Sequence, residues 1–284
     1  MTIFTDALYR PIEIKRTPQR IVSLVPSITE ALFTFGLGDA VVGVTRFCVE
    51  PREAVAPKAK VGGTKTLDVS QVRQLQPDLV IANVEENRPE DVRQLIAAGL
   101  NVMVTFPRTV AAGIAMMRQI SEMTDSVETA RPIIEEAATG LAEARATNDA
   151  RRPLRVFCPI WRNPWMSVGP DTYIHDFLNV CGGLNIFARR HERYPITDMN
   201  EVARKDPQII LLPDEPYHFG AKHLPEVSKY PYVSAVQDQR VHLIEGKHLC
   251  WYGPRIAGSL RFVQDLLWGA APDGAGMGAG AIRS

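Results

Sequence analysis

The sequence predicts an α/β protein of two Rossmann-like lobes, each a mainly parallel sheet flanked by helices, joined by one long bridging α-helix. Three observations favour this class: short apolar segments alternate with helical ones, one uninterrupted helical stretch divides the chain, and a motif of the first half recurs in the second. The 284 residues, 45% hydrophobic and 23% charged, suffice for two lobes with separate cores.

The first half of the chain consists of strand and helix units. Short apolar strands are expected at 20–25, 41–44, 79–82 and 102–104, with a helix at 91–98. Ser27 and Glu30 form an S-x-x-E capping box, which predicts a helix that ends at Gly36 or Gly38. Continuous apolar runs are typical of parallel strands whose two faces are both covered.

One long helix is expected to join the halves. From Asp125, a candidate N-cap, to about Thr147, the sequence is rich in Ala and Glu with an apolar stripe, and such a helix is roughly 30 Å long. Pro132 falls in its first turns and is expected to shift its start or kink it. The second half then predicts strands at 154–157 and 209–212, a helix at 171–180 ended by Cys181-Gly182-Gly183, and a last helix opened by Pro254 and ended by Gly269.

These elements give the expected domain organisation. It comprises an N-terminal extension at 1–19, a first lobe at 20–124, the bridging helix at 125–147, a second lobe at 148–269 and a tail at 270–284. The tail is rich in Gly and Ala without periodicity and is expected to be disordered. Its glycines at 274–280 lack the G-x-G-x-x-G spacing and the following helix of a dinucleotide-binding loop.

A motif recurs at a constant offset of 130 residues. Asp68, Val72, Pro77 and Glu85 correspond to Asp198, Val202, Pro207 and Glu215. In each copy an acidic residue begins a short helix, a proline ends it, an apolar strand follows, and a glutamate lies just past the strand. Because ligands of open α/β sheets bind outside the carboxyl ends of strands, we expect a binding cleft between the two lobes.

Composition argues against several classes of protein. Lys plus Arg and Asp plus Glu number 32 each, and this zero net charge disfavours a general nucleic-acid binder. No apolar run of about 18 residues suggests a membrane-spanning helix. The first twenty residues lack the apolar stretch of a signal peptide, which favours a cytoplasmic location unless a leader was removed. The widely spaced Cys48, Cys158, Cys181 and Cys250 are expected to be free, mostly buried thiols.

Several segments resemble a known family. They are RIVSLVPSITEALFTFGLGDAVVGVT, VGGTKTLDVSQVRQLQPDLVIANVEEN, SVGPDTYIHDFLNVCGGLNIF, DPQIILLPDEPY and WYGPRIAGSLRFVQDL. They resemble substrate-binding proteins of iron-siderophore and vitamin B12 ABC importers, the class III periplasmic binding proteins or helical-backbone metal receptors, over about Arg20 to Leu267. The resemblance implies little hinge closure, no catalysis, no intrinsic cofactor and a periplasmic or cell-surface monomer. Its ligand would be a metal chelate, namely cobalamin, a ferric siderophore or a haem-like molecule, delivered to a permease.

In this family a glutamate on each lobe pairs with arginines of the permease. The resemblance assigns this docking role to Glu85 or Glu86 in the first lobe and Glu215 in the second, and the repeat favours Glu85 with Glu215. Two carboxylates at opposite ends of the long axis would fix the orientation of the partner. The alternative is a pair of solvated rim glutamates that only cap helices.

Family ligands bind in a groove lined by aromatic and a few polar side chains. Aromatic side chains at loop tips give a large contact area at little entropy cost, and an arginine pairs with carboxylate or phosphate groups. The candidate ligand-binding residues are Arg46, Phe47, Cys48, Trp161, Arg162, Trp165, Tyr217, Trp251, Tyr252 and Arg255. The alternative is that several of them pack between the lobes, above all Tyr252 and Arg255. Cobalamin-binding members have a tryptophan where this chain has Gly63-Thr64-Lys65, which argues against cobalamin itself.

Direct metal binding is another open alternative. Side chains of ligand type are Cys48, His175, Glu215, His218, His223 and Cys250, of which His218 and His223 are the candidate metal pair, and none has a tight metal-binding spacing. Without a nucleophile elbow, a phosphate loop or an H-E-x-x-H motif, no catalytic residue is expected. A cytosolic corrinoid- or metal-binding protein, or an enzyme recruited on the same fold, remains the alternative function.

Overall fold

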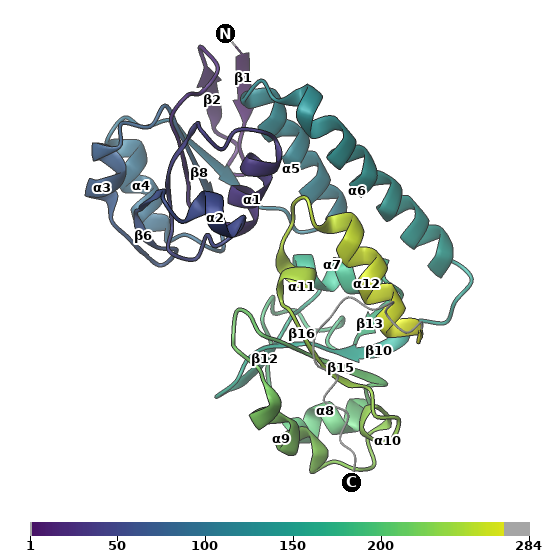
Figure 1. Ribbon diagram of the computed structural model, residues 1–284. Helices are drawn as coiled ribbons and strands as arrows, with labels where there is room; N and C mark the ends of the chain where they lie inside the picture. Colours follow the sequence, from purple (N-terminus) through teal and green to yellow (C-terminus); the bar gives the residue numbers. More distant parts are fainter. Residues whose placement is uncertain (1, 270–284) are drawn as a thin grey trace.

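The computed structural model describes residues 2–269, and the expected tail at 270–284 lies outside them. Figure 1 shows two α/β lobes, one above the other, with the long helix α6 (Val127–Asn148) running along one side of both. The predicted fold class is therefore confirmed. Within the described part of the chain, no helix combines the length and the apolar character that crossing a membrane requires.

The first lobe is built on a five-stranded parallel sheet in the order β5-β4-β3-β8-β9. Its strands are β3 (Ile21–Ser23), β4 (Val41–Val44), β5 (Ala59–Lys60), β8 (Leu79–Asn83) and β9 (Val102–Thr105), and a small hairpin pairs β6 (Gly62–Gly63) with β7 (Thr66–Leu67). Its helices are α1 (Pro26–Thr34), α2 (Arg52–Val55), α3 (Val69–Gln74), α4 (Pro89–Ala97) and α5 (Val110–Met123). Every residue of β3, β8 and β9 is buried, as expected for a sheet covered on both faces.

Helix α1 begins differently from the prediction. Its N-cap is Val25 and Pro26 occupies the first turn, where the missing N–H costs nothing. The expected capping box is therefore wrong: the Ser27 hydroxyl is buried without a hydrogen-bond partner among residues 2–269, and Glu30 pairs instead with Arg255 of the second lobe. The predicted stop at Gly36 is confirmed, with φ +82° at that glycine.

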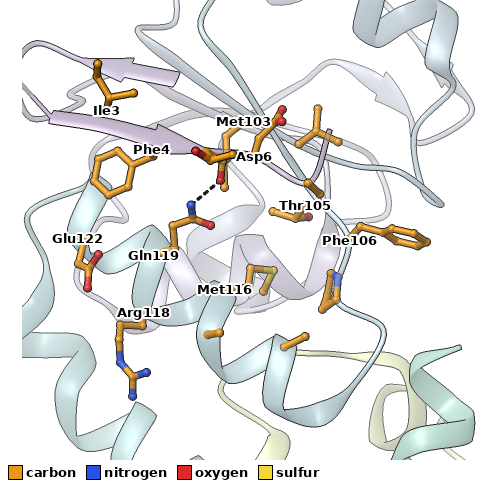
Figure 2. Close-up of a pocket in the computed structure, with 16 residues that line it drawn as sticks. Ile3, Phe4, Asp6, Met103, Thr105, Phe106, Met116, Arg118, Gln119 and Glu122 are labelled. Carbon is orange, nitrogen blue, oxygen red and sulfur yellow. Dashed lines mark hydrogen bonds between the residues drawn. The ribbon is translucent and has the colours of Figure 1, made fainter. Parts of the chain in front are cut away.

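The N-terminal segment packs on the edge of the first sheet. Strands β1 (Thr2–Thr5) and β2 (Pro11–Ile14) form an antiparallel hairpin. Arg10 pairs with Asp6, and its Nη2 donates to the carbonyl oxygen of Val102 in β9 at 2.9 Å. A pocket of about 600 Å³ lies between this hairpin, β9 and α5, where Gln119 Nε2 donates to the Thr5 carbonyl at 2.8 Å (Figure 2). Its lining residues all precede α6, so this pocket is not shared with the second lobe.

The second lobe has a four-stranded parallel sheet in the order β13-β10-β15-β16. Its strands are β10 (Leu154–Phe157), β13 (Gly183–Asn185), β15 (Ile209–Pro213) and β16 (Val241–Ile244), and a separate antiparallel sheet joins β11 (Pro159–Trp161), β12 (Trp165–Ser167) and β14 (Ile196–Thr197). Its helices are α7 (Tyr173–Val180), α8 (Met199–Lys205), the 3₁₀ turn η1 (Ala221–His223), α9 (Leu224–Ser228), α10 (Ser234–Gln237), α11 (Lys247–Cys250) and α12 (Ile256–Trp268). The sequence did not indicate the antiparallel sheet, because its strands have only two or three residues.

Helix α6 packs against α5 of the first lobe and α12 of the second. Ser126, not Asp125, is its N-cap, while Asp125 takes the left-handed conformation with φ +56°. Pro132 lies inside the helix. Gly140 permits close contact, because a Cβ there would lie 3.3 Å from Cα of Ala257 in α12. One helix is thus fixed to both lobes, although the expected domain boundaries stay a prediction.

The sequence repeat is also a structural repeat. Asp68 caps α3 by accepting a hydrogen bond from the backbone N–H of Gln71, and Asp198 caps α8 by accepting one from that of Glu201. Gln76 and Asp206, at the ends of these helices, both have φ +47°. In each copy the strand that follows, β8 or β15, is wholly buried. Glu85 and Glu215, just past these strands, therefore occupy corresponding positions in the two lobes.

Candidate functional site

The carboxyl ends of the two sheets face each other. Glu50, in the loop after β4, pairs with Lys247 after β16 at 2.8 Å (Oε1 to Nζ). The Lys247 ammonium group, through its hydrogen bond, lowers the pKa of Glu50. We call the loops that follow β4, β8, β10, β15 and β16 the interlobe site. The predicted location of the binding site, outside the strand ends and between the lobes, corresponds to this region.

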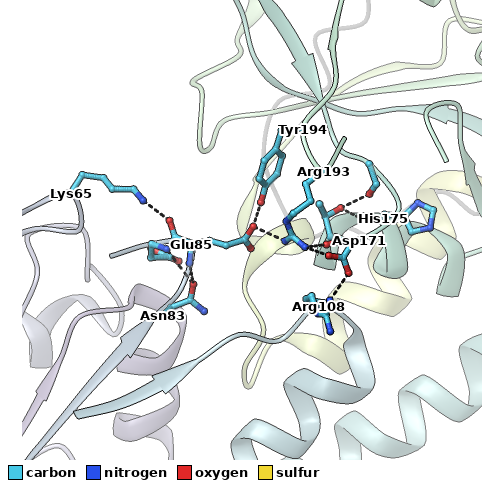
Figure 3. A network of polar contacts seen from close by, with 11 residues as sticks. Lys65, Asn83, Glu85, Arg108, Asp171, His175, Arg193 and Tyr194 are labelled. Atoms are coloured by element: carbon cyan, nitrogen blue, oxygen red, sulfur yellow. Dashed lines mark hydrogen bonds and ion pairs between the residues drawn. The ribbon is translucent and has the colours of Figure 1, made fainter. Parts of the chain in front are cut away.

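Glu85, just after β8, is bound by the second lobe (Figure 3). Its Oε1 accepts a hydrogen bond from Arg193 Nη2 at 2.7 Å and another from the hydroxyl of Tyr194. Arg193 also pairs with Asp171, whose Oδ1 lies 2.8 Å from Nη1 of Arg108 in the first lobe. Burial, and then the Glu85 carboxylate, raises the pKa of Tyr194, so its hydroxyl remains a donor.

Glu86 in the first lobe lies close enough to Glu215 in the second lobe for the charge of Glu215 to act on it. Burial, and then the charge of Glu215, raises the pKa of Glu86 to about 7. Burial also raises the pKa of Glu215, whose Oε1 is 3.7 Å from the Cys250 thiol. The expectation that Glu85 and Glu215 mark opposite ends of the long axis is therefore wrong. Both follow strands whose carboxyl ends point toward the other lobe, so they lie at the interlobe site.

An aromatic cluster, defined as Trp161, Trp165, Tyr217, Phe219 and His223, occupies the second-lobe side. The ring centroids of Trp161 and Tyr217 are 5.5 Å apart, edge to face, and Trp165 stacks on Phe219 at 5.6 Å. Trp161 is 45% exposed, which leaves its ring available to a ligand. Three predicted groove residues, two from strands β11 and β12 and one from the loop after β15, are thus brought together.

Arg162 is held beside this cluster. Its Nη2 lies 2.7 Å from Glu226 Oε1, and its guanidinium carbon lies 6.0 Å from the centre of the Trp165 ring. The Glu226 carboxylate raises the pKa of Arg162 through its hydrogen bond. Since Arg162 already has an internal carboxylate partner, an anionic ligand group would have to compete with Glu226.

The ligand-binding residues predicted in the first lobe differ in their exposure to solvent. Arg46 and Phe47 are exposed in the loop after β4, with the guanidinium 5.2 Å from the ring centre. Cys48 is buried, 3.1 Å from the Thr29 hydroxyl, and burial raises the pKa of its thiol. Arg46 and Phe47 are therefore accessible from solvent, whereas Cys48 belongs to the core of the lobe.

Trp251, Tyr252 and Arg255 lie where the lobes touch. Trp251 is buried, with the cationic groups of Lys247 and Arg255 5.2 and 5.4 Å from its ring centre. Tyr252 is buried edge to face against Tyr173, and a Cβ at Gly113 would approach its Cβ to 3.1 Å. The structure thus places these residues in the contact between lobes, the alternative that the sequence left open.

The two candidate metal-binding histidines are not arranged alike. His223 is buried: its Nδ1 accepts from the Gly220 backbone at 3.0 Å and its Nε2 lies 3.3 Å from the Tyr217 hydroxyl. His218 is exposed. Across residues 2–269, no three or more His, Cys, Asp or Glu side chains are grouped so as to hold a metal ion.

The residues that join the lobes were not among those predicted from the sequence. They are Glu30, Glu50, Arg108, Asp171, Arg193, Tyr194 and Lys247. Glu30 lies inside α1, where the sequence suggested a capping box instead, and the others lie in loops or at helix ends without a recognisable motif. In each ion pair between the lobes the two partners are distant in sequence. Only the high density of charges at 189–194 gave a local signal.

The family model described as "Periplasmic binding protein" matches residues 21–246. This chain belongs to that family. Its members are solute-binding proteins rather than enzymes, which confirms the predicted class and the expectation of a non-catalytic protein.

Three known proteins are similar to this chain. The chain is 26% identical over 193 residues to a vitamin B12-binding protein of Vibrio cholerae, covering 68% of this chain and 70% of the relative. It is 27% identical over 275 residues to an uncharacterized ABC transporter substrate-binding lipoprotein of Bacillus subtilis, covering 94% and 85%. A solved periplasmic heme-binding protein from Roseiflexus has a TM-score of 0.78 at 22% identity, covering 88% and 98%, and so shares the fold.

Proposed function

We propose that this periplasmic binding protein captures a metal chelate of the cobalamin, ferric siderophore or haem type between its lobes and delivers it, as a monomer, to an ABC importer. The observation on which this rests is the partly exposed Trp161 ring, supported by Tyr217 at the carboxyl ends of the second-lobe strands. A flat chelate gains contact area from such a ring at little cost in side-chain entropy.

The relatives support the class of solute. One is named for vitamin B12 and another for heme, and both of these molecules hold a metal ion in a large, nearly flat macrocycle. The Bacillus relative is named as part of an ABC transporter, which supports an importer as the partner. The exposed Arg46 and Phe47 would contact the solute from the first lobe.

The charges at the interlobe site favour a particular kind of chelate. The charge of Glu215 in the second lobe acts on Glu86 in the first, and the pKa values of both carboxyl groups are raised, so each is neutralised more easily than an exposed glutamate. A cationic group or metal centre placed between them would restore the charged state of both carboxylates. We infer that the preferred chelate presents positive charge to these residues.

This arrangement changes the roles expected of the glutamates. Glu85 is occupied by Arg193, and Glu215 lies beside Cys250, where its charge acts on Glu86 of the first lobe. We therefore assign Glu86 and Glu215 to the solute and Glu85 to the contact between lobes. Docking to the importer would then use other surface residues.

Calorimetric titration tests this function. The panel comprises cyanocobalamin, haemin, ferrichrome, ferric enterobactin and the free ions Fe³⁺, Ni²⁺ and Zn²⁺. We expect saturable binding of one chelate, weakened about 5- to 100-fold in Trp161→Ala, which corresponds to about 1 to 3 kcal/mol. The matched control is Tyr232→Ala, because Tyr232 is 64% exposed in another loop of the same lobe. Binding of free ions alone, or equal weakening in both variants, would contradict the proposal.

A further inference from the structure

We propose that Arg193 closes a latch between the lobes, formed by Arg108, Asp171, Arg193, Tyr194 and Glu85, that limits how often the interlobe site opens (Figure 3). The latch is closed in the protein without any solute. That it would also slow the exchange of a bound solute rests on the proposed function.

Arg193 reaches from the second lobe into the first. Its guanidinium contacts Glu85 after β8, and its carbon atom Cζ lies 4.9 Å from the ring centre of Phe106 after β9. Through Asp171 it is also linked to Arg108. A single side chain thus engages two neighbouring loops of the opposite lobe, which an isolated surface pair does not do.

The loop that bears Arg193 is held close to the second lobe. The backbone N–H of Gly169 donates to the Arg193 carbonyl at 2.7 Å, and that of Ser167 donates to the Pro195 carbonyl at 3.0 Å. A Cβ at Gly169 would come within 2.0 Å of the Glu192 carbonyl oxygen, so the close approach requires a glycine. The guanidinium is therefore positioned by its own lobe before it meets Glu85, which reduces the entropy cost of the contact.

Two further ion pairs, Glu30 with Arg255 and Glu50 with Lys247, also join the lobes, but one part of the interface differs in character from all of these pairs. Around Tyr252, Tyr173 and Gly113 the contact is buried and largely apolar. In the latch, by contrast, the side chains of Arg193 and Glu85 are 27% and 31% exposed. Water can solvate these groups once they separate, whereas separating the buried contact would expose apolar surface. We expect opening to occur on the latch side, with the buried contact and α6 remaining in place.

Cys250 provides a readout of opening that needs no solute. Its thiol lies next to Glu215, and the charge of Glu86 from the first lobe contributes to its raised pKa, behind burial and Glu215. The other cysteines, Cys48, Cys158 and Cys181, are buried within the lobes. Alkylation of the native protein by N-ethylmaleimide, resolved by mass spectrometry, therefore reports access to the interlobe site.

The test compares Arg193→Ala with Arg190→Ala. Arg190 lies in the same loop but pairs with Glu201 of its own lobe, so its loss leaves the latch intact. We expect Cys250 of Arg193→Ala to react about tenfold faster than in the wild type, and Arg190→Ala to react at the wild-type rate. Glu85→Gln, changed in the other lobe, should accelerate the reaction similarly, and the double variant Glu85→Gln with Arg193→Ala should be no faster than Arg193→Ala alone.

Two other outcomes would contradict the proposed latch. A wild-type alkylation rate in both Arg193→Ala and Glu85→Gln, with thermal unfolding showing folded protein, would show that the ion pairs do not limit opening. Equal acceleration in Arg190→Ala would indicate a general loosening of the loop instead. Because no solute is used, failure of chelate binding would contradict the proposed function and leave this result standing.

Discussion

Glu85 and Arg193 lie 108 residues apart in the chain, yet Glu85 Oε1 and Arg193 Nη2 are 2.7 Å apart. One residue belongs to each lobe, so this pair reports directly on their arrangement. Exposed ion pairs contribute about 0 to 1 kcal/mol, but this one shares its arginine with Asp171 and Phe106. Arg193 therefore holds the two lobes together at the interlobe site.

Glu86→Gln should change the pH dependence of stability. The pKa of Glu86 is about 7 in the folded protein and 4.5 ordinarily, so folding favours its protonated form. The free energy of unfolding of the wild type therefore falls as pH rises from about 4.5 to about 7. At pH 8 the glutamine variant should be more stable than the wild type by at most about 3 kcal/mol, with little difference at pH 4.5.

Urea unfolding at both pH values measures this difference. The control is Glu143→Gln, in which an exposed glutamate of α6 is changed. A Glu86→Gln variant that is less stable than the wild type at pH 8 would show that the ionised carboxylate has a partner that stabilises it.

Gly169→Ala and Gly258→Ala should have opposite effects. At position 169 a Cβ meets the Glu192 carbonyl oxygen at 2.0 Å, and we expect a loss of about 2 kcal/mol or more of stability. At position 258, exposed in α12, a Cβ meets nothing within 4 Å, so alanine should stabilise the helix by about 0.5 to 1 kcal/mol. Thermal unfolding should show melting temperatures shifted in opposite directions, and a shift of the same sign would contradict the packing described.

Trp165→Ala should lower the stability of the protein much more than Trp161→Ala, because Trp165 supports the fold whereas Trp161 is available for binding. Trp165 stacks on Phe219 and packs against Phe157, so its loss should reduce the free energy of unfolding by about 2 to 3 kcal/mol. Trp161 is 45% exposed, and its loss should cost less than about 1 kcal/mol. Urea denaturation that ranks the two variants in the reverse order would place Trp161 in the core.

The helix N-caps Asp68 and Asp198, which correspond in the repeat, should contribute equally to the free energy of unfolding. Asp68→Ala and Asp198→Ala each remove one hydrogen bond to a helix N-terminus, and each should lower stability by about 1 kcal/mol. Since the two sites lie in different lobes, their effects should add in the double variant. Chemical denaturation of the three variants measures this, and a clear departure from additivity would show that the two lobes are coupled through these helices.

The regular elements were predictable because their signals are local. The strands at 41–44 and 154–157 have the expected bounds, since a short apolar run between polar segments specifies a buried strand. The repeat predicted both capped helices, because Asp68 and Asp198 act on backbone groups three residues away. The bridging helix at 127–148 was likewise predictable from its composition and length.

The contacts between lobes were not predictable in the same way. Pairs such as Glu30 with Arg255, separated by 225 residues, depend on how two sheets are oriented around α6. Local sequence contains no signal for that orientation. For the same reason the effect of the Glu215 charge on Glu86 was not predicted, and the glutamates were expected at opposite ends of the molecule.

The most direct test of the account is a tryptophan-fluorescence titration of the wild type and Trp161→Phe with cyanocobalamin, haemin, ferrichrome and ferric enterobactin, each of which, once bound, quenches the emission of a nearby indole. If the solute binds between the lobes against the aromatic cluster, one chelate should quench the wild type saturably at one molecule per chain. Trp161→Phe should then lose much of that quenching while still binding the chelate. Quenching of equal depth in both proteins, or no saturable quenching by any of the four chelates, would contradict the interlobe site proposed here.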